Sequence, residues 1–215
     1  MFPGFPSTFA GPLLFTPQDN LNTDGIYPGK YTYQDDMTLE QQAKVVMENY
    51  DPSFAATASA LVKDLKVSSE SNTKEGVVLV AGYNFGTGSS REQAATSLKA
   101  AGVPLVIAGS FGDIFKRNAI NNALICMECP ELVRDLTESY TPNRKRNEGG
   151  PQGELTINPS WKVQVNMASG SVYVTTEEGE QRFYSVRPIG QSVQELWTCD
   201  GLEGFVVQKL REQAA

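Results

Sequence analysis

Two serines followed by an arginine, Ser89, Ser90 and Arg91, are the side chains of this sequence best suited to carry chemistry. The chain contains no histidine, so proton transfer near neutral pH needs another kind of base. A serine hydroxyl can act as a base only when its ionised form is stabilised by amides, a helix terminus or a cation. Arg91 could supply that cation, and its planar guanidinium suits two-point binding of a carboxylate. The motif therefore predicts a carboxylate site with Ser89 as a candidate base.

This motif is expected to lie between a strand and a helix. Residues 77–81 are β-branched and apolar, which is typical of a buried strand, and residues 92–101 predict a helix closed by Gly102. The glycines on either side of Thr87 permit a tight turn and let a ligand approach the main chain. A plainer interpretation also stays open, in which the two serines cap the helix and the arginine is solvated.

A second strand, turn and helix follow the first. Residues 105–108 predict another buried strand, and residues 111–122 predict the helix after it. Because the carboxyl ends of parallel strands meet at one edge of a sheet, we expect Gly109 and Ser110 beside the serine motif.

The remaining segments complete an α/β pattern in a single domain that spans residues 1–215. Residues 1–13 are interpreted as a linker because they are rich in proline and glycine, and the polar residues 141–156 as a flexible loop. The other expected elements are a helix from the capping box Thr38–Gln41 to about Asn49, a helix at 55–65, an antiparallel hairpin of 162–166 with 172–176, and helical turns at 193–197 and 204–210.

Three segments, in this order, resemble signatures of the aconitase superfamily. Residues 19–31 are similar to the opening signature of its mobile swivel domain, residues 86–93 to its serine-serine-arginine motif, and residues 109–124 to its second strand, turn and helix. The resemblance extends over about residues 14–210 and is to the carboxy-terminal part of the homoaconitase branch, as found in fungi. It implies a swivelling β/β/α three-layer fold with a parallel central sheet and a second antiparallel layer.

The resemblance also implies an activity. Members of this branch are hydro-lyases that interconvert homoaconitate and homoisocitrate, sometimes with homocitrate dehydration, in lysine biosynthesis by the α-aminoadipate pathway. It implies Ser89 as catalytic base, Ser90 and Arg91 as ligands of substrate carboxylates, and Asp24 near the departing hydroxyl. A 4Fe-4S cluster would be bound by other domains of the same parent chain and not by this one, so the isolated domain is expected to be inactive.

Two positions depart from aconitase itself. Gln93 stands where aconitase has a histidine, which favours the branch that holds homoaconitase and isopropylmalate isomerase. In the loop where aconitase has an arginine for the distal carboxylate, this sequence offers Lys30. Lys30 is therefore the candidate for that role, with a surface lysine as the alternative interpretation. Tyr33, within residues 31–34, is expected to line the distal end of the pocket.

Composition narrows the choice of partners. The formal net charge of -7 and a pI near 4.7 disfavour nucleic acid, which needs a basic face, so the basic residues 144–146 are interpreted as a solvated loop. A tricarboxylate must then be held by local positive groups. No run approaches the roughly twenty apolar residues of a membrane span, and mitochondrial residence follows from the resemblance alone.

The spacing of Cys126 and Cys129 suggests a metal or redox site. A cluster needs at least three thiolates, and the third cysteine, Cys199, is distant in sequence, so both are interpreted as buried and inert. Two functions besides that of homoaconitase stay open for the chain: the small subunit of isopropylmalate isomerase, and a carboxylate-binding module without catalysis.

Overall fold

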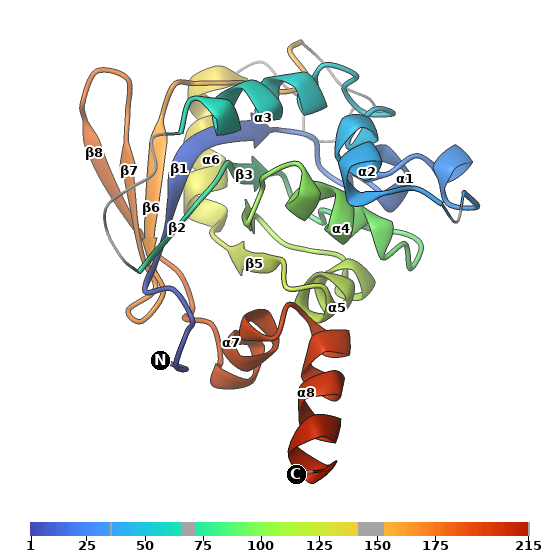
Figure 1. The fold of residues 1–215 in the computed structure, drawn as a ribbon. Helices are drawn as coiled ribbons and strands as arrows, with labels where there is room; N and C mark the ends of the chain where they lie inside the picture. The colour runs from blue at the N-terminus through green and yellow to red at the C-terminus, as the bar shows by residue number, and fades with distance from the viewer. Residues whose placement is uncertain (35, 66–71, 142–152, 215) are drawn as a thin grey trace.

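One mixed sheet forms the centre of the molecule (Figure 1). The structure, a computed structural model, describes residues 1–34, 36–65, 72–141 and 153–214. Within them the sheet has eight strands in the order β5-β4-β3-β1-β6-β7-β8, with β2 beside β1. Their bounds are β1 Thr8–Thr16, β2 Thr73–Glu75, β3 Val78–Ala81, β4 Leu105–Ala108, β5 Ile125–Glu128, β6 Lys162–Asn166, β7 Ser171–Thr175 and β8 Gln181–Ser185.

The strand β1 belongs to both halves of this sheet. Its carboxyl half runs parallel to β3, which continues through β4 to β5 as a parallel sheet. Its amino half pairs antiparallel with β6, followed by β7 and β8. The prediction of a parallel central sheet with a second antiparallel layer is therefore confirmed, and the hairpin of β6 with β7 is confirmed with it.

Alternate side chains along the strands point to opposite faces of the sheet and pack into two separate buried cores. In β1, Leu14 packs against the helices α2 to α5 on one face of the parallel strands. Leu13 and Phe15 point the other way, toward α6 and the antiparallel strands. Helices, parallel strands and antiparallel strands thus form three layers. The helices are α1 Thr23–Ile26, α2 Leu39–Val45, α3 Phe54–Lys63, α4 Gln93–Ala100, α5 Asp113–Asn121, α6 Pro130–Tyr140, α7 Gln191–Thr198 and α8 Leu202–Ala214, with a 3-10 turn, η1, at Gly29–Tyr31.

The predicted capping box begins α2. The Thr38 hydroxyl accepts from the Gln41 amide (3.2 Å), and the Gln41 side chain accepts from the Thr38 amide (2.8 Å). The helix ends at Val45, earlier than the expected Asn49, because Val46 leaves the helical conformation (ψ 133°) and Met47 then takes a left-handed backbone angle (φ 62°).

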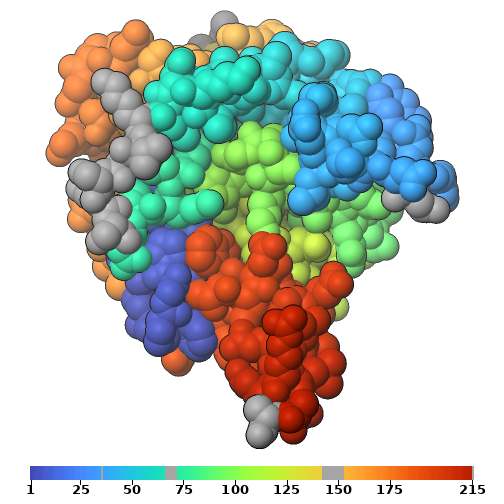
Figure 2. Space-filling model, viewed as in Figure 1, coloured from blue at the N-terminus to red at the C-terminus, as the bar shows by residue number. Residues whose placement is uncertain are grey.

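The interpretation of residues 1–13 as a linker is wrong, since residues 8–13 form most of β1. Phe5 and Phe9 are buried and pack edge-on against Trp197 of α7, with ring centroids 5.3 and 5.9 Å away. Figure 2 shows this N-terminal segment beside the C-terminal helices. Gly11 makes this segment look like a linker in the sequence. Close packing requires glycine at this position, because an added Cβ would lie 1.7 Å from the Gly76 carbonyl oxygen.

Two further expectations concern the rest of the chain. Most of the predicted flexible loop 141–156, with its basic residues 144–146, lies outside the described residues. Within the described part, none of the helices is both long and apolar enough to cross a membrane.

Candidate functional site

The site lies where the loops after β1 and β3 meet. The Thr23 amide donates to the Thr87 carbonyl (2.9 Å), and the Gly86 amide donates to the Leu21 carbonyl (2.8 Å). These bonds join the loop that carries Asp24 to the loop that carries the serine motif. Both segments, distant in sequence, are thereby fixed in register at the carboxyl edge of the parallel strands.

The loop after β4 joins the same edge, as the sequence predicts. The Phe85 amide donates to the Ser110 carbonyl (3.0 Å), and the Gly112 amide donates to the Phe85 carbonyl (2.9 Å). Gly86 has a left-handed backbone angle (φ 74°), and an added Cβ there would lie 2.3 Å from the Phe115 ring. Only glycine fits this position without displacing the α5 side chain.

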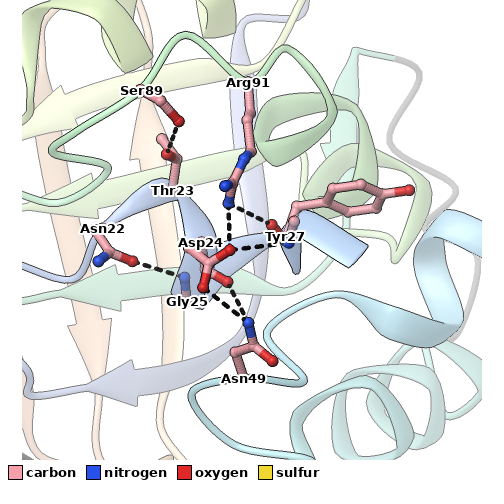
Figure 3. Close-up of polar contacts among 9 residues, drawn as sticks. Asn22, Thr23, Asp24, Gly25, Tyr27, Asn49, Ser89 and Arg91 are labelled. Carbon is pink, nitrogen blue, oxygen red and sulfur yellow. Dashed lines mark hydrogen bonds and ion pairs between the residues drawn. The ribbon is translucent and has the colours of Figure 1, made fainter. Parts of the chain in front are cut away.

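Arg91 forms an ion pair with Asp24 (Figure 3). Its Nη1 atom donates to Asp24 Oδ1 (2.6 Å) and to the Tyr27 carbonyl (3.2 Å), and its side chain is 23% exposed. The interpretation of Arg91 as a solvated residue is therefore wrong. The guanidinium is held at the junction of the two loops.

Asp24 accepts two further hydrogen bonds. The Gly29 amide donates to Oδ1 (2.9 Å), and the Asn49 side-chain amide donates to Oδ2 (3.0 Å). The Gly29 amide and the Arg91 guanidinium hold the pKa of Asp24 below its usual value, although partial burial opposes them. Asp24 is consequently a carboxylate at neutral pH.

The two serines do not cap α4. That helix begins at Gln93, and its N-cap, Glu92, makes no side-chain capping bond. Ser89 and Ser90 are exposed in the loop before it, and Ser89 Oγ lies 3.0 Å from Thr23 Oγ1 (Figure 3). Ser89 is thus exposed on the loop that also carries Arg91, where an incoming molecule can reach it.

The two remaining predicted residues lie nearby on the same loop but make different contacts. Lys30 is exposed, forms an ion pair with Glu48 and lies over the Tyr31 ring, 4.8 Å from its centroid. Hydrogen bonding from Lys30 and the Tyr31 hydroxyl lowers the pKa of Glu48, so both partners are charged. Tyr33 is 91% exposed. Arg91 and Asp24 therefore contact each other directly and Ser89 contacts Thr23, the neighbour of Asp24, whereas Lys30 pairs with Glu48.

Sequence reasoning missed three residues of this network: Thr23, Gly29 and Asn49. The first two fall inside the segment 19–31, and the cap-forming residues before Asp24 were an available signal for Thr23. No local pattern points to Asn49, because its contact with Asp24 depends on the turn after α2.

The cysteines do not fit the ligand set of an iron-sulfur cluster. Cys126 and Cys129 are buried, and burial raises the pKa of both thiols. Cys199 lies at the end of α7 and contacts Gln208. Among the described residues, no three histidine, cysteine or acidic side chains gather closely enough to bind a metal ion. Because both thiols are buried, the geometry disfavours a redox role for this pair as well.

The fold and the site together define a mixed α/β domain with an arginine–carboxylate pair and an exposed serine at the edge of its parallel strands. Residues 4–132 match the Aconitase C-terminal domain family, and the chain belongs to that family.

Curated relatives from three fungi are each named mitochondrial homoaconitase. The relative from Cryptococcus neoformans is 59% identical over 204 residues, which is 94% of this chain. Those from Mycosarcoma maydis and Candida albicans are 56% and 44% identical over 96% and 98% of the chain. The chain spans 28% of the length of each of these relatives.

A solved structure has the same fold over nearly its whole length. The 3-isopropylmalate dehydratase of Methanocaldococcus jannaschii superposes with a TM-score of 0.64 at 27% identity, covering 96% of this chain and 98% of that one. The predicted fold class and the resemblance to the aconitase superfamily are both confirmed.

Proposed function

We propose that this chain is the swivel domain of a mitochondrial homoaconitase, which interconverts homoaconitate and homoisocitrate in lysine biosynthesis. The proposal is supported by the fungal relatives, which carry that name and are 44–59% identical over almost the whole chain. Since those relatives are much longer, the rest of the active site, including a 4Fe-4S cluster, is assigned to parts of the protein outside this chain. When bound, that cluster supplies an electrophilic iron for the substrate hydroxyl.

Ser89 is the proposed base, and its accessibility beside a fixed cation is the single observation that carries the proposal. In dehydration, the ionised hydroxyl takes a proton from a substrate carbon. The electron pair of that C–H bond becomes the new double bond, and the hydroxyl group leaves from the neighbouring carbon. In hydration, a hydroxyl group adds to one carbon of the double bond, and Ser89 returns the proton to the other carbon.

Arg91 and Ser90 are the proposed ligands of substrate carboxylates. The bonds of Arg91 to Asp24 and Tyr27 both leave from Nη1, and within the described residues its Nε and Nη2 atoms donate to no acceptor. Those two atoms form the fork that binds a carboxylate at two points. Asp24 orients this fork and is proposed to lie near the departing hydroxyl.

Lys30 and Tyr33 are proposed to meet the distal end of the substrate. For Lys30, this role requires an exchange of partners, because the Glu48 carboxylate already pairs with its ammonium group. Because Glu48 competes with the substrate for Lys30, the distal carboxylate would be bound more weakly than by a lysine without an ion-pair partner.

The substitution Ser89→Ala in the full-length, cluster-loaded protein tests the proposed base. We expect turnover of homoaconitate to fall by roughly two to four orders of magnitude, because the proton transfer to carbon loses its donor. Ser185→Ala, an exposed serine on β8, is the matched control and should leave turnover unchanged. Undiminished hydration by the Ser89→Ala protein would remove the mechanism.

A second candidate function is isopropylmalate isomerisation, which the likeness to the 3-isopropylmalate dehydratase structure favours. Both substrates present a carboxylate to the same serine and arginine, and they differ at the distal end. Turnover of homoaconitate and of isopropylmalate by the same preparation separates the two. A preference for isopropylmalate would favour isopropylmalate isomerisation as the function of this chain.

A further inference from the structure

Thr23 contacts the proposed base directly. Its Oγ1 atom lies 3.0 Å from Ser89 Oγ, and the two hydroxyls are 66 positions apart in sequence. Thr23 is only 2% exposed, whereas Ser89 faces solvent. Within the described part of the chain, the Thr23 hydroxyl makes no other hydrogen bond, so its proton is available to Ser89.

The backbone fixes the position of this hydroxyl. The Thr23 amide donates to the Thr87 carbonyl (2.9 Å), and the Thr23 carbonyl accepts from the Tyr27 amide (2.9 Å). The Asn22 side chain caps the same short helix by accepting from the Gly25 amide (2.8 Å). As a β-branched residue, Thr23 also has few side-chain rotamers. The hydroxyl is therefore held beside Ser89 before any ligand arrives.

Ionisation of Ser89 determines the direction of this hydrogen bond. An alkoxide has no proton, so it can only accept, and Thr23 must then donate. A hydrogen bond to a charged acceptor is about twice as strong as one between neutral groups. The charge of Arg91 is partly offset by its ion pair with Asp24, which increases the need for a nearby donor.

We propose that Thr23 is a positioning residue whose hydroxyl donates a hydrogen bond to Ser89 and stabilises the ionised serine. The proton of Thr23 stays on Thr23 throughout, and the substrate proton goes to Ser89. The catalytic part of this inference rests on the proposed function, whereas the contact between the two hydroxyls does not.

Kinetics of the full-length, cluster-loaded protein test the catalytic part. We expect Thr23→Val, which replaces the hydroxyl with a methyl group of similar size, to lower kcat about tenfold to a hundredfold with little change in KM. The low-pH limb of the kcat profile for homoisocitrate dehydration should move to higher pH, because the serine becomes harder to ionise. Thr23→Ser, which keeps the hydroxyl, should restore most of the rate. Thr176→Val is the matched control, since Thr176 is buried and its hydroxyl accepts from Glu180 in the distant β-hairpin.

A thiol at position 89 tests the contact without relying on any enzyme activity. In the full-length Ser89→Cys protein, the rate of iodoacetamide alkylation at this position, followed by peptide mass spectrometry, reports the fraction of thiolate. Adding Thr23→Val should slow alkylation at neutral pH about tenfold, because the thiolate loses a donor. Adding Thr23→Ser, or Thr176→Val, should leave the rate close to that of the single variant.

The outcomes separate the inference from the proposed function. Equal alkylation rates with threonine and valine at position 23 would overturn the inference. A loss of turnover that Thr23→Ser does not rescue, with an equal fall in Tm for both variants, would also overturn it in favour of a structural role. If the protein hydrates neither homoaconitate nor isopropylmalate, the proposed function fails, and the alkylation rates still decide whether Thr23 stabilises an anion at position 89.

Discussion

Three donors converge on the carboxylate of Asp24: the Gly29 amide, the Asn49 side chain and the Arg91 guanidinium. Each occupies a separate direction around the two oxygens, so the carboxylate cannot rotate without losing at least one bond. The orientation of Arg91 is therefore set by residues that themselves need not contact a substrate.

The substitution Gly29→Ala is expected to displace Arg91. An added Cβ would lie 2.9 Å from Arg91 Nη2 and 3.0 Å from Asp24 Oδ1, so the guanidinium must shift. We expect the KM for homoaconitate in the full-length protein to rise about tenfold, because small misplacements of a binding group are costly. Gly190→Ala is the control, since nothing lies within 4 Å of its added Cβ. Equal KM values for the two variants would contradict this account.

The ion pair of Asp24 also predicts a dependence of stability on pH. Its pKa is lowered in the folded state by the Gly29 amide and by Arg91, so its stabilising contribution is present above the ordinary value of 3.8. That contribution is lost as the pH falls through the lowered pKa. Asp24→Asn should therefore reduce the free energy of unfolding at pH 7, and the difference from the original protein should shrink toward pH 2. We expect less than about 1 kcal/mol, because the side chain is 48% exposed. Urea denaturation across this range measures it, and a difference that does not change with pH would argue against the ion pair as its cause.

At the scale of elements, the site depends on three loops whose main chains contact one another. The loop after β3 bonds to the loop after β1 and to the loop after β4 through Gly86 and Phe85. Backbone contacts of this kind leave little room for a side chain, which explains the demand for glycine at position 86.

Gly86→Ala should destabilise the fold more than a left-handed glycine elsewhere. Both Gly86 and Gly179 have left-handed angles (φ 74° and 86°), but only at Gly86 does an added Cβ meet a side chain, 2.3 Å away on Phe115. We expect Gly86→Ala to cost about 1–3 kcal/mol more than Gly179→Ala, because it adds overpacking to the same backbone strain. Chemical denaturation of the two variants measures this difference, and equal costs would mean that α5 adjusts without penalty.

Local sequence patterns were sufficient for some elements and not for others. The strands β3 and β4 and the helix between them follow from short apolar runs and end signals. The strand β1 was missed because Gly11 and Pro12 interrupt its pattern, and its identity depends on pairing with β6, far along the chain. In β8 only Tyr184 is buried, as expected for an edge strand, so alternation there is too weak to detect.

In the site too, local patterns predicted some features, and others depend on contacts between distant segments. The individual residues Ser89, Arg91 and Asp24 were predicted, because each lies in a recognisable segment. Their mutual contacts were not, since the bonds of Thr23 to Ser89 and of Asn49 to Asp24 depend on how distant loops are placed. Sequence reasoning therefore singled out these three residues as candidates and missed the residues that contact them.

At the scale of the whole molecule, the N-terminal segment packs against α7, near the C-terminus. Phe2 donates its amide to the Gln194 side chain (2.7 Å), and Phe5 packs on Trp197. This contact ties the segment before β1 to α7, so residues far apart in the sequence contribute to one core.

The substitution Phe5→Ala tests the packing of the N-terminal segment on α7 and, with it, the proposal that the chain forms a single domain. We expect a cost of about 3–5 kcal/mol in the free energy of unfolding, as for other buried aromatic side chains. Phe183→Ala, at a phenylalanine that is 61% exposed, should cost less than about 0.5 kcal/mol. Both should unfold in one transition by circular dichroism and by tryptophan fluorescence. Equal, small costs would restore the interpretation of this segment as a linker.

Because β1 pairs with strands in both halves of the sheet, its pairing bears on how the protein folds during synthesis. Thr16 pairs with Ala81, but Thr8 must wait for Asn166, so one edge of β1 has no partner until residues 162–166 have left the ribosome. Pairings over such separations are slow, because the entropy of a long loop is lost before its contacts are gained. During translation this exposed edge is a surface that can aggregate with other nascent chains or recruit a chaperone.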